Sequence, residues 1–160
     1  MIRRGGLFAA ATGGILALSA CGASATSDGG GATAPPPSAT VSVRSVAPLG
    51  QLLVDANGRS LYLFEVDATT ASTCYAACVQ TWQPLTTEGS PRAASGASQS
   101  LLGTTVRTDH LTQVTYNGHP LYYYSGDSKP GDVNGEGMQC FGGGWDVVSP
   151  AGAKIPKPGG

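Results

Sequence analysis

Three cysteines carry the most reactive side chains of the presumed folded region: Cys74, Cys78 and Cys140. Thiols join as disulfides in an oxidising compartment, and free thiolates attack electrophiles or bind soft metals. The spacing of Cys74 and Cys78 predicts a disulfide with a distorted helical turn, while a bond from Cys140 to one of them stays open as the alternative. The spacing differs from the Cys-x-x-Cys of thioredoxin-like enzymes, so we interpret the pair as a structural staple.

Cys140 also belongs to a set of residues with soft-metal chemistry. Together with Met138, His110 and His119 it would supply the sulfur and nitrogen ligands of a copper site. These residues show no regular ligand spacing. The sequence therefore predicts no metal and no other cofactor, and a redox or copper-handling accessory protein that uses Cys140 is kept as an alternative.

Acidic residues offer two further possibilities. Asp67 and Asp127 are candidate paired carboxyls of a glycosidase, yet they end equivalent strands, where capping a turn is the simpler role. The segment 132–137, DVNGEG, is similar to the start of a calcium loop, but the last ligand of such a loop falls on Gly143, which has no side chain. We expect turns at these positions.

The Tyr122-Tyr123-Tyr124 run is a candidate platform for carbohydrate. Along a strand, alternation sends the middle ring to the opposite face, so at least part of the run belongs to the core. The chain contains no Gly-x-Ser-x-Gly, His-Glu-x-x-His or phosphate-binding glycine loop. We therefore predict that the protein is not an enzyme, and keep an unrecognised cell-wall or carbohydrate hydrolase as a further alternative.

The start of the chain has the layout of a lipoprotein signal peptide. Arg3 and Arg4 give a positive start, residues 7–18 form a short apolar stretch, and Leu-Ser-Ala precedes Cys21. This tetrad resembles the bacterial signal in which the cysteine sulfur takes a diacylglyceryl group. We expect cleavage after residue 20 and a membrane anchor of acyl chains such as palmitate on Cys21, in which each buried CH2 contributes about 0.8 kcal/mol.

Composition restricts the partners of the protein. The chain has 160 residues and a net charge of −1, and loss of Arg3 and Arg4 leaves 7 basic against 10 acidic residues, a net charge of −3. No Lys/Arg cluster remains that would neutralise phosphates, so nucleic acid is not expected. Residues 21–47 are rich in Gly, Ala, Ser and Pro, which predicts a disordered linker between the lipid and a folded domain.

Residues 54–67 and 114–127 are two copies of one pattern, in which Val, Asn-Gly, Leu-Tyr, an aromatic residue and Asp recur at a constant offset. The pairs Asn57-Gly58 and Asn117-Gly118 are typical of type I′ turns. Each copy therefore predicts a tight hairpin with a two-residue loop. Trp82 and Trp145 then follow their copies at nearly the same distance.

The first hairpin has an apolar pattern on both faces. A two-residue loop places Val54 opposite Leu61 and Asp55 opposite Ser60. Alternation then predicts one face with Leu52, Val54, Leu61 and Leu63, and another with Leu53, Tyr62 and Phe64. We expect each copy to cover the sheet of the other. Leu101–Val106 and Leu111–Tyr116 predict a further hairpin around His110, and Thr73–Trp82 predicts one short helix.

The two copies resemble a family of bacterial secreted-repeat lipoproteins, recognised by paired Tyr-x-(Phe/Trp/Tyr)-x-x-Asp motifs. Here the motifs are Tyr62, Phe64 and Asp67, and Tyr122, Tyr124 and Asp127. The similarity extends from Leu49 to Ile155 and includes Cys-x-x-x-Cys followed by Trp-Gln-Pro-Leu, and Phe-Gly-Gly-Gly-Trp near the end. The resemblance implies no catalytic residue. His110, where a turn glycine is usual, and Cys140 depart from the pattern.

The predicted fold is mainly β, with two homologous hairpin repeats packed into one small sandwich- or barrel-like domain and one short helix near the Cys-x-x-x-Cys. The predicted organisation is a signal peptide at 1–20, a linker at 21–47, the double-repeat domain at 48–156 and a flexible tail at 157–160. We expect a monomeric, exported, lipid-anchored module of the cell surface or periplasm that binds an unknown envelope protein or ligand, or serves a structural role there, without catalysis.

Overall fold

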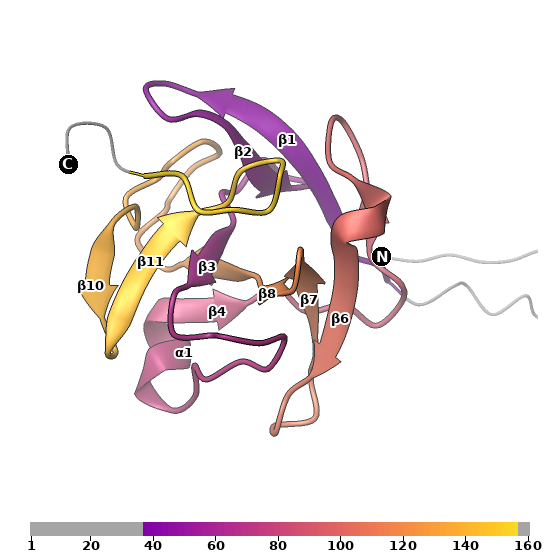
Figure 1. Cartoon of the computed structure of the whole chain (residues 1–160), viewed down its shortest axis with the longest axis vertical. Helices are drawn as coiled ribbons and strands as arrows, with labels where there is room; N and C mark the ends of the chain where they lie inside the picture. Colours follow the sequence, from indigo (N-terminus) through magenta and orange to yellow (C-terminus); the bar gives the residue numbers. More distant parts are fainter. Residues whose placement is uncertain (1–36, 157–160) are drawn as a thin grey trace, which may run out of the picture. The chain divides into compact units, whose positions relative to one another are not determined.

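The computed structural model describes residues 37–156. The predicted signal peptide, Cys21, most of the predicted linker and the predicted tail lie outside these residues. No helix in the described part is long and apolar enough to cross a membrane. In chain order (Figure 1) the elements are β1 (Thr40–Val46), β2 (Gly50–Asp55), β3 (Tyr62–Phe64), α1 (Ala77–Thr81), β4 (Trp82–Pro84), β5 (Arg92–Ala93), η1 (Gln99–Leu101), β6 (Leu102–Val106), β7 (Thr112–Tyr116), β8 (His119–Pro120), β9 (Tyr122–Tyr124), β10 (Met138–Cys140) and β11 (Gly143–Val147).

The fold is mainly β, as predicted, and its strands curl into a half-barrel. Hydrogen bonding orders them as β2-β1-β5, β10-β11-β3-β9-β4 and β6-β7-β8. All pairs are antiparallel except β1 with β5. The α1 helix near the cysteine pair and the two repeats also agree with the prediction.

Strands of the two copies alternate in the central sheet. β3 and β4 come from the first copy and β9 and β11 from the second, in the order β11-β3-β9-β4. The strand pairs on the two sides of the central β3–β9 pair are equivalent, because they join aromatic residues at the same positions of the two copies. The pairs are Tyr62 with Tyr122, Phe64 with Trp145, and Tyr124 with Trp82.

The domain begins earlier than predicted. Residues 40–46, assigned to the linker, form β1, which pairs with β2 from Val41 opposite Asp55 to Val46 opposite Gly50. Val41 is fully buried. The alternating Thr-Val-Ser-Val of this segment is a strand pattern, so the predicted boundary at residue 48 is wrong.

The first hairpin is also different from the prediction. Only Gly58 of the Asn-Gly pair has positive φ, at 81°, and the amide of Asp55 donates to the carbonyl of Arg59. The loop therefore has three residues, 56–58, and Val54 bridges Ser60 instead of Leu61. Asp55 Oδ1 accepts the amides of Asn57 and Arg59 at 2.8 and 2.9 Å, which stabilises this longer turn.

A shift by one residue turns every later side chain to the other face of the sheet. Two buried clusters result, and both faces are covered as expected, but with different members from those predicted. One cluster contains Leu52, Val54, Tyr62, Phe64, Trp82, Tyr122 and Trp145 with both cysteines of the pair. The other contains Val41, Leu53, Leu61, Leu63, Leu85, Val114, Tyr116, Leu121 and Val148.

The second copy follows the prediction more closely. Asn117 and Gly118 have φ values of 49° and 83°, and Tyr116 pairs with His119, which is the two-residue hairpin. β6 pairs with β7 around a turn in which His110 has φ 66°, so histidine occupies the left-handed position there. The α1 helix is shorter than the predicted Thr73–Trp82 because the chain leaves helical geometry at Ala76, with φ 51°.

Candidate functional site

The paired Tyr-x-aromatic-x-x-Asp motifs of the two copies contact each other. The hydroxyl of Tyr62 donates to Asp127 Oδ2 at 2.7 Å, and the hydroxyl of Tyr122 donates to Asp67 Oδ2 at 2.5 Å. Each tyrosine thus binds the aspartate of the other copy. We call these two hydrogen bonds the reciprocal clasp. Tyr62 and Tyr122 are directly opposed on β3 and β9, which brings both bonds to the centre of the domain.

Each aspartate of the clasp also caps the loop that follows its own strand. Asp67 Oδ1 accepts the amide and the hydroxyl of Thr73 at 2.8 and 2.6 Å, and Asp127 Oδ1 accepts the amide of Asn134 at 2.9 Å. The predicted turn-capping role is therefore correct for both, and the tyrosine partners are additional. Asp67 is buried, with 2% of its surface exposed, whereas Asp127 is partly exposed.

Burial controls the protonation of the clasp. Desolvation raises the pKa values of Tyr62 and Tyr122 well above the ordinary value, and the hydrogen bonds to Asp127 and Asp67 raise them further. Both phenols remain proton donors throughout the neutral range. Burial also raises the pKa of Asp127 above its usual value, against the opposing effect of the Tyr62 hydrogen bond.

This raised pKa predicts a pH dependence of folding. A raised folded pKa means that Asp127 contributes most stability below its unfolded pKa of about 3.9 and loses that contribution as pH rises through the folded pKa. The Asp127→Asn variant lacks this titration. The free energy of unfolding of the wild type, minus that of the variant, should therefore fall between acidic and neutral pH in urea denaturation series. A difference that grows with pH would show that Asp127 is not destabilised by burial.

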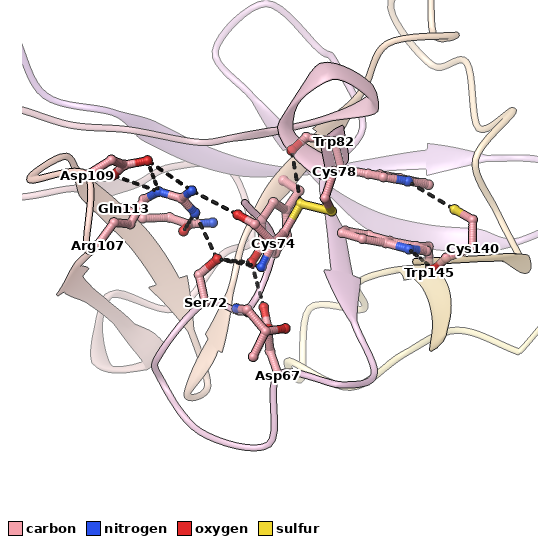
Figure 2. The surroundings of a disulfide bond; sticks show 12 residues. Asp67, Ser72, Cys74, Cys78, Trp82, Arg107, Asp109, Gln113, Cys140 and Trp145 are labelled. Carbon is pink, nitrogen blue, oxygen red and sulfur yellow. Dashed lines mark hydrogen bonds and ion pairs between the residues drawn. A yellow bond between two sulfur atoms is a disulfide. The ribbon is translucent and has the colours of Figure 1, made fainter. Parts of the chain in front are cut away.

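A buried arginine extends the clasp into a polar network. Arg107 is 2% exposed and donates to Ser72 Oγ at 2.8 Å and to Gln113 Oε1 at 2.9 Å, while Ser72 Oγ lies 2.7 Å from the Tyr122 hydroxyl. Its second terminal nitrogen donates to the carbonyl of Cys74 at 2.9 Å (Figure 2). Asp109 is a further hydrogen-bond partner of Arg107, and this hydrogen bonding lowers the pKa of the Asp109 carboxyl, which keeps it ionised. The network links β6 to the loop before α1.

The predicted disulfide is present between Cys74 and Cys78, with Cα atoms 5.3 Å apart. Ala76, with φ 51°, provides the distorted turn that this spacing requires. Both cysteines are buried in the first cluster, which supports the structural reading of the pair.

Replacement of both cysteines by serine should lower the free energy of unfolding by about 2 kcal/mol, because a short cross-linked loop removes limited entropy from the unfolded chain. Urea denaturation under non-reducing conditions measures this. Wild type in reductant is the matched control and should coincide with the variant. Equal stability of the oxidised wild type and the variant would contradict the staple role.

Cys140 lies at the edge of a stack of aromatic rings. The indoles of Trp82 and Trp145 are parallel, with centroids 4.0 Å apart, and Phe64 stacks on Trp145 at 4.1 Å. Trp82 Nε1 donates to Cys140 Sγ at 3.4 Å and Trp145 Nε1 donates to the Cys140 carbonyl at 3.2 Å. Figure 2 shows both indole N–H groups turned toward Cys140. The thiol is therefore part of the packing of the aromatic core.

A groove lies on the surface beside residues 37–40, and we call it the polar groove after the hydroxyl and carboxylate side chains along it. It consists of two hollows of about 670 and 690 Å3, and both are lined by Glu88 and Thr112. Tyr123 lines the first hollow, and its hydroxyl donates to Asp55 Oδ2 at 3.0 Å. The alternation predicted for the tyrosine run is correct, because Tyr122 belongs to the first cluster and Tyr123 packs against the second.

A model of secreted repeats of unknown function matches residues 44–86 and 103–149, which together cover more than half of the chain. The protein is a member of this secreted repeat family. The two matched segments correspond to the two copies, so the resemblance stated from the sequence is confirmed. Membership in a secreted family places this secreted repeat protein outside the cytoplasm. No curated protein and no solved structure matches the chain.

The candidate metal ligands of the secreted repeat protein do not converge. Met138 and Cys140 both pack on the first cluster, whereas His110 lies in the β6–β7 turn and His119 in β8. Within residues 37–156 no group of three or more His, Cys, Asp or Glu side chains is arranged to hold a metal ion.

The calcium-like segment of the secreted repeat protein is a turn. Asp132 Oδ2 accepts the amides of Ser128 and Lys129 at 3.0 and 3.1 Å, and Glu136 Oε2 accepts the amide of Val147 at 2.7 Å. These oxygens serve separate backbone groups. The sequence analysis did not single out Arg107, and the signal available for it was an arginine that directly follows an uncharged stretch, 98–106.

Proposed function

We propose that the protein is a lipid-anchored, non-enzymatic binding module of the cell envelope. Three observations support the proposal. The family is described as secreted, the Leu-Ser-Ala-Cys21 tetrad resembles a lipoprotein signal, and the tyrosines and aspartates of the two motifs bind each other inside the domain. We expect the acyl chains on Cys21 to hold the domain at a membrane.

The reciprocal clasp is the observation that carries the non-enzymatic part. A glycosidase needs one carboxyl free to donate a proton and another free to attack or to activate water. Asp67 accepts three hydrogen bonds and Asp127 accepts two, from tyrosines and from loop residues. Both carboxyls therefore serve the fold, and the motif is better explained as scaffold than as reactive site.

The way in which the two copies cover each other supports a monomeric protein. The two copies of the repeat cover each other's faces within one chain, and strands of the two copies alternate in one sheet. This arrangement resembles that of a symmetric dimer joined into a single polypeptide. A second chain is not needed to bury the repeat faces.

Labelling with an alkyne analogue of palmitate tests the anchor. The full chain, expressed in a bacterial host with a lipoprotein pathway, should take up the label and fractionate with membranes. Cys21→Ala should lose the label and leave the membrane fraction, whereas Cys140→Ser, which removes a cysteine of the domain, should keep both. Membrane fractionation of an unlabelled Cys21→Ala protein would contradict the anchor.

A further inference from the structure

The polar groove has the dimensions of a ligand site that the clasp, the disulfide and the aromatic stack leave unused. Its two hollows share Glu88 and Thr112 in their linings, so they adjoin on the surface. Each hollow lies in the size range of small-molecule sites, about 300 to 1,000 Å3. Two adjoining hollows of this size have room for more than one linked unit of a ligand.

The charges of the groove select against anionic ligands. Asp55 and Glu88 line it, His110 is the one histidine among its described lining residues, and none of these residues is Lys or Arg. The carboxylate of Asp55 is already engaged by Tyr123 and by two backbone amides. Glu88 is exposed at the junction of both hollows and remains available to a ligand. A polymer with repeated negative charges would be repelled.

Hydroxyl and amide side chains supply most of the remaining polar groups. The exposed ones are Asn57 and Thr86 in the first hollow, and Ser90, Gln99 and Thr104 in the second. Hydroxyls both donate and accept hydrogen bonds, and an exposed carboxylate accepts strongly from neighbouring hydroxyls of a ligand. This combination suits a ligand that is itself dense in hydroxyl groups.

An apolar surface lies beside these polar groups in the first hollow. Leu111 is 48% exposed, and Tyr123 lines the same hollow. The ring of Tyr123 is held in place by its bond to Asp55 and by the guanidinium of Arg59, 4.0 Å from the ring centroid. Apolar and aromatic surface of this kind packs against the C–H face of a sugar ring, and a fixed ring loses little entropy on binding.

We infer that the polar groove binds a neutral oligosaccharide strand, with Glu88 at its centre. The inference deepens the proposed function by naming the ligand class of the envelope module. It does not depend on the lipid, so the palmitate labelling and the binding experiment fail independently. A peptide strand along the β6 edge is the competing occupant, and the experiment below separates the two.

Amide chemical shifts of the full chain test the inference, in micelles of a detergent without a sugar headgroup. The probes are maltohexaose, cellohexaose and N-acetylchitohexaose, with hexagalacturonate as the anionic comparison and a neutral alanine-rich hexapeptide as the peptide comparison. At least one neutral oligosaccharide should shift the amides of Asn57, Thr86, Glu88 and Thr112 saturably, with Kd of about 1 mM or lower, or about −4 kcal/mol. Hexagalacturonate and the peptide should leave these amides unchanged.

Glu88→Ala provides the matched variant, because Glu88 is exposed and its loss should not disturb folding. It should weaken binding by about 5-fold or more, as expected for a lost charge-assisted hydrogen bond. Gln83→Ala, an exposed change on β4 outside the groove, should bind as the wild type does. The inference is overturned if no neutral oligosaccharide shifts the groove amides, if hexagalacturonate or the peptide shifts them, or if Glu88→Ala binds unchanged.

Discussion

Arg107→Ala should lower the free energy of unfolding by about 4 kcal/mol, because removal of one member of a buried charged network leaves its partners without donors. Ser72, Gln113 and the carbonyl of Cys74 all accept from this guanidinium, and Gln113 is fully buried. Urea denaturation measures the change. The loss should exceed the effect of any single substitution at an exposed position.

Arg59→Ala is the matched control for this prediction. The guanidinium of Arg59 lies 4.0 Å from the centroid of the Tyr123 ring, but Arg59 is only half-buried. A cation–π contact of this kind contributes about 1 kcal/mol. If Arg107→Ala and Arg59→Ala cost the same, the buried network does not stabilise the fold in the way its geometry indicates.

Asp67→Ala should lower the free energy of unfolding by about 3 kcal/mol, since it removes three hydrogen bonds at a buried position and leaves the Tyr122 hydroxyl without its carboxylate. Asp127→Ala removes the equivalent bond to Tyr62 at a partly exposed position. It should cost about half as much, because water can replace part of what is lost. Denaturant unfolding of both variants at neutral pH measures the ratio of the two losses. A larger loss for Asp127→Ala would contradict the prediction that Asp67 contributes more to stability.

The internal repeat contains more of the fold than the apolar pattern of either copy shows alone. The apolar pattern of the second copy predicts the β6–β7 pair, and the equivalent pair of the first copy is β1–β2. The segment of β1 falls within the predicted linker, because the residues before it are rich in Pro, Ser and Ala. The second copy contained the signal for β1, since β6 precedes β7 in the same way.

The register error has a local physical cause. Asn57-Gly58 and Asn117-Gly118 have the same sequence, yet only the second pair forms the two-residue turn. Asp55 stands two residues before the first pair, and its carboxylate accepts two backbone amides of the loop. The equivalent residue of the second copy is Thr115, which pairs with Pro120. A dipeptide pattern alone does not include this side-chain cap.

The clasp could be predicted only in part. Its four residues belong to the paired motifs found in the sequence, and the aspartates were correctly expected to cap turns. The exchange of partners between the copies was not foreseen, because it depends on the alternation of β3 and β9 in one sheet. The position of Cys140 beside Trp82 likewise depends on contacts between residues 58 positions apart.

A double-mutant cycle on Tyr122 and Asp67 tests the central claim that the paired motif is a clasp between repeats. The single variants Tyr122→Phe and Asp67→Asn and their combination are compared by urea denaturation. If Tyr122 and Asp67 act as one unit, the combined loss of unfolding free energy should fall short of the sum of the single losses by about 1 to 2 kcal/mol. Losses that add to within about 0.3 kcal/mol would contradict the claim.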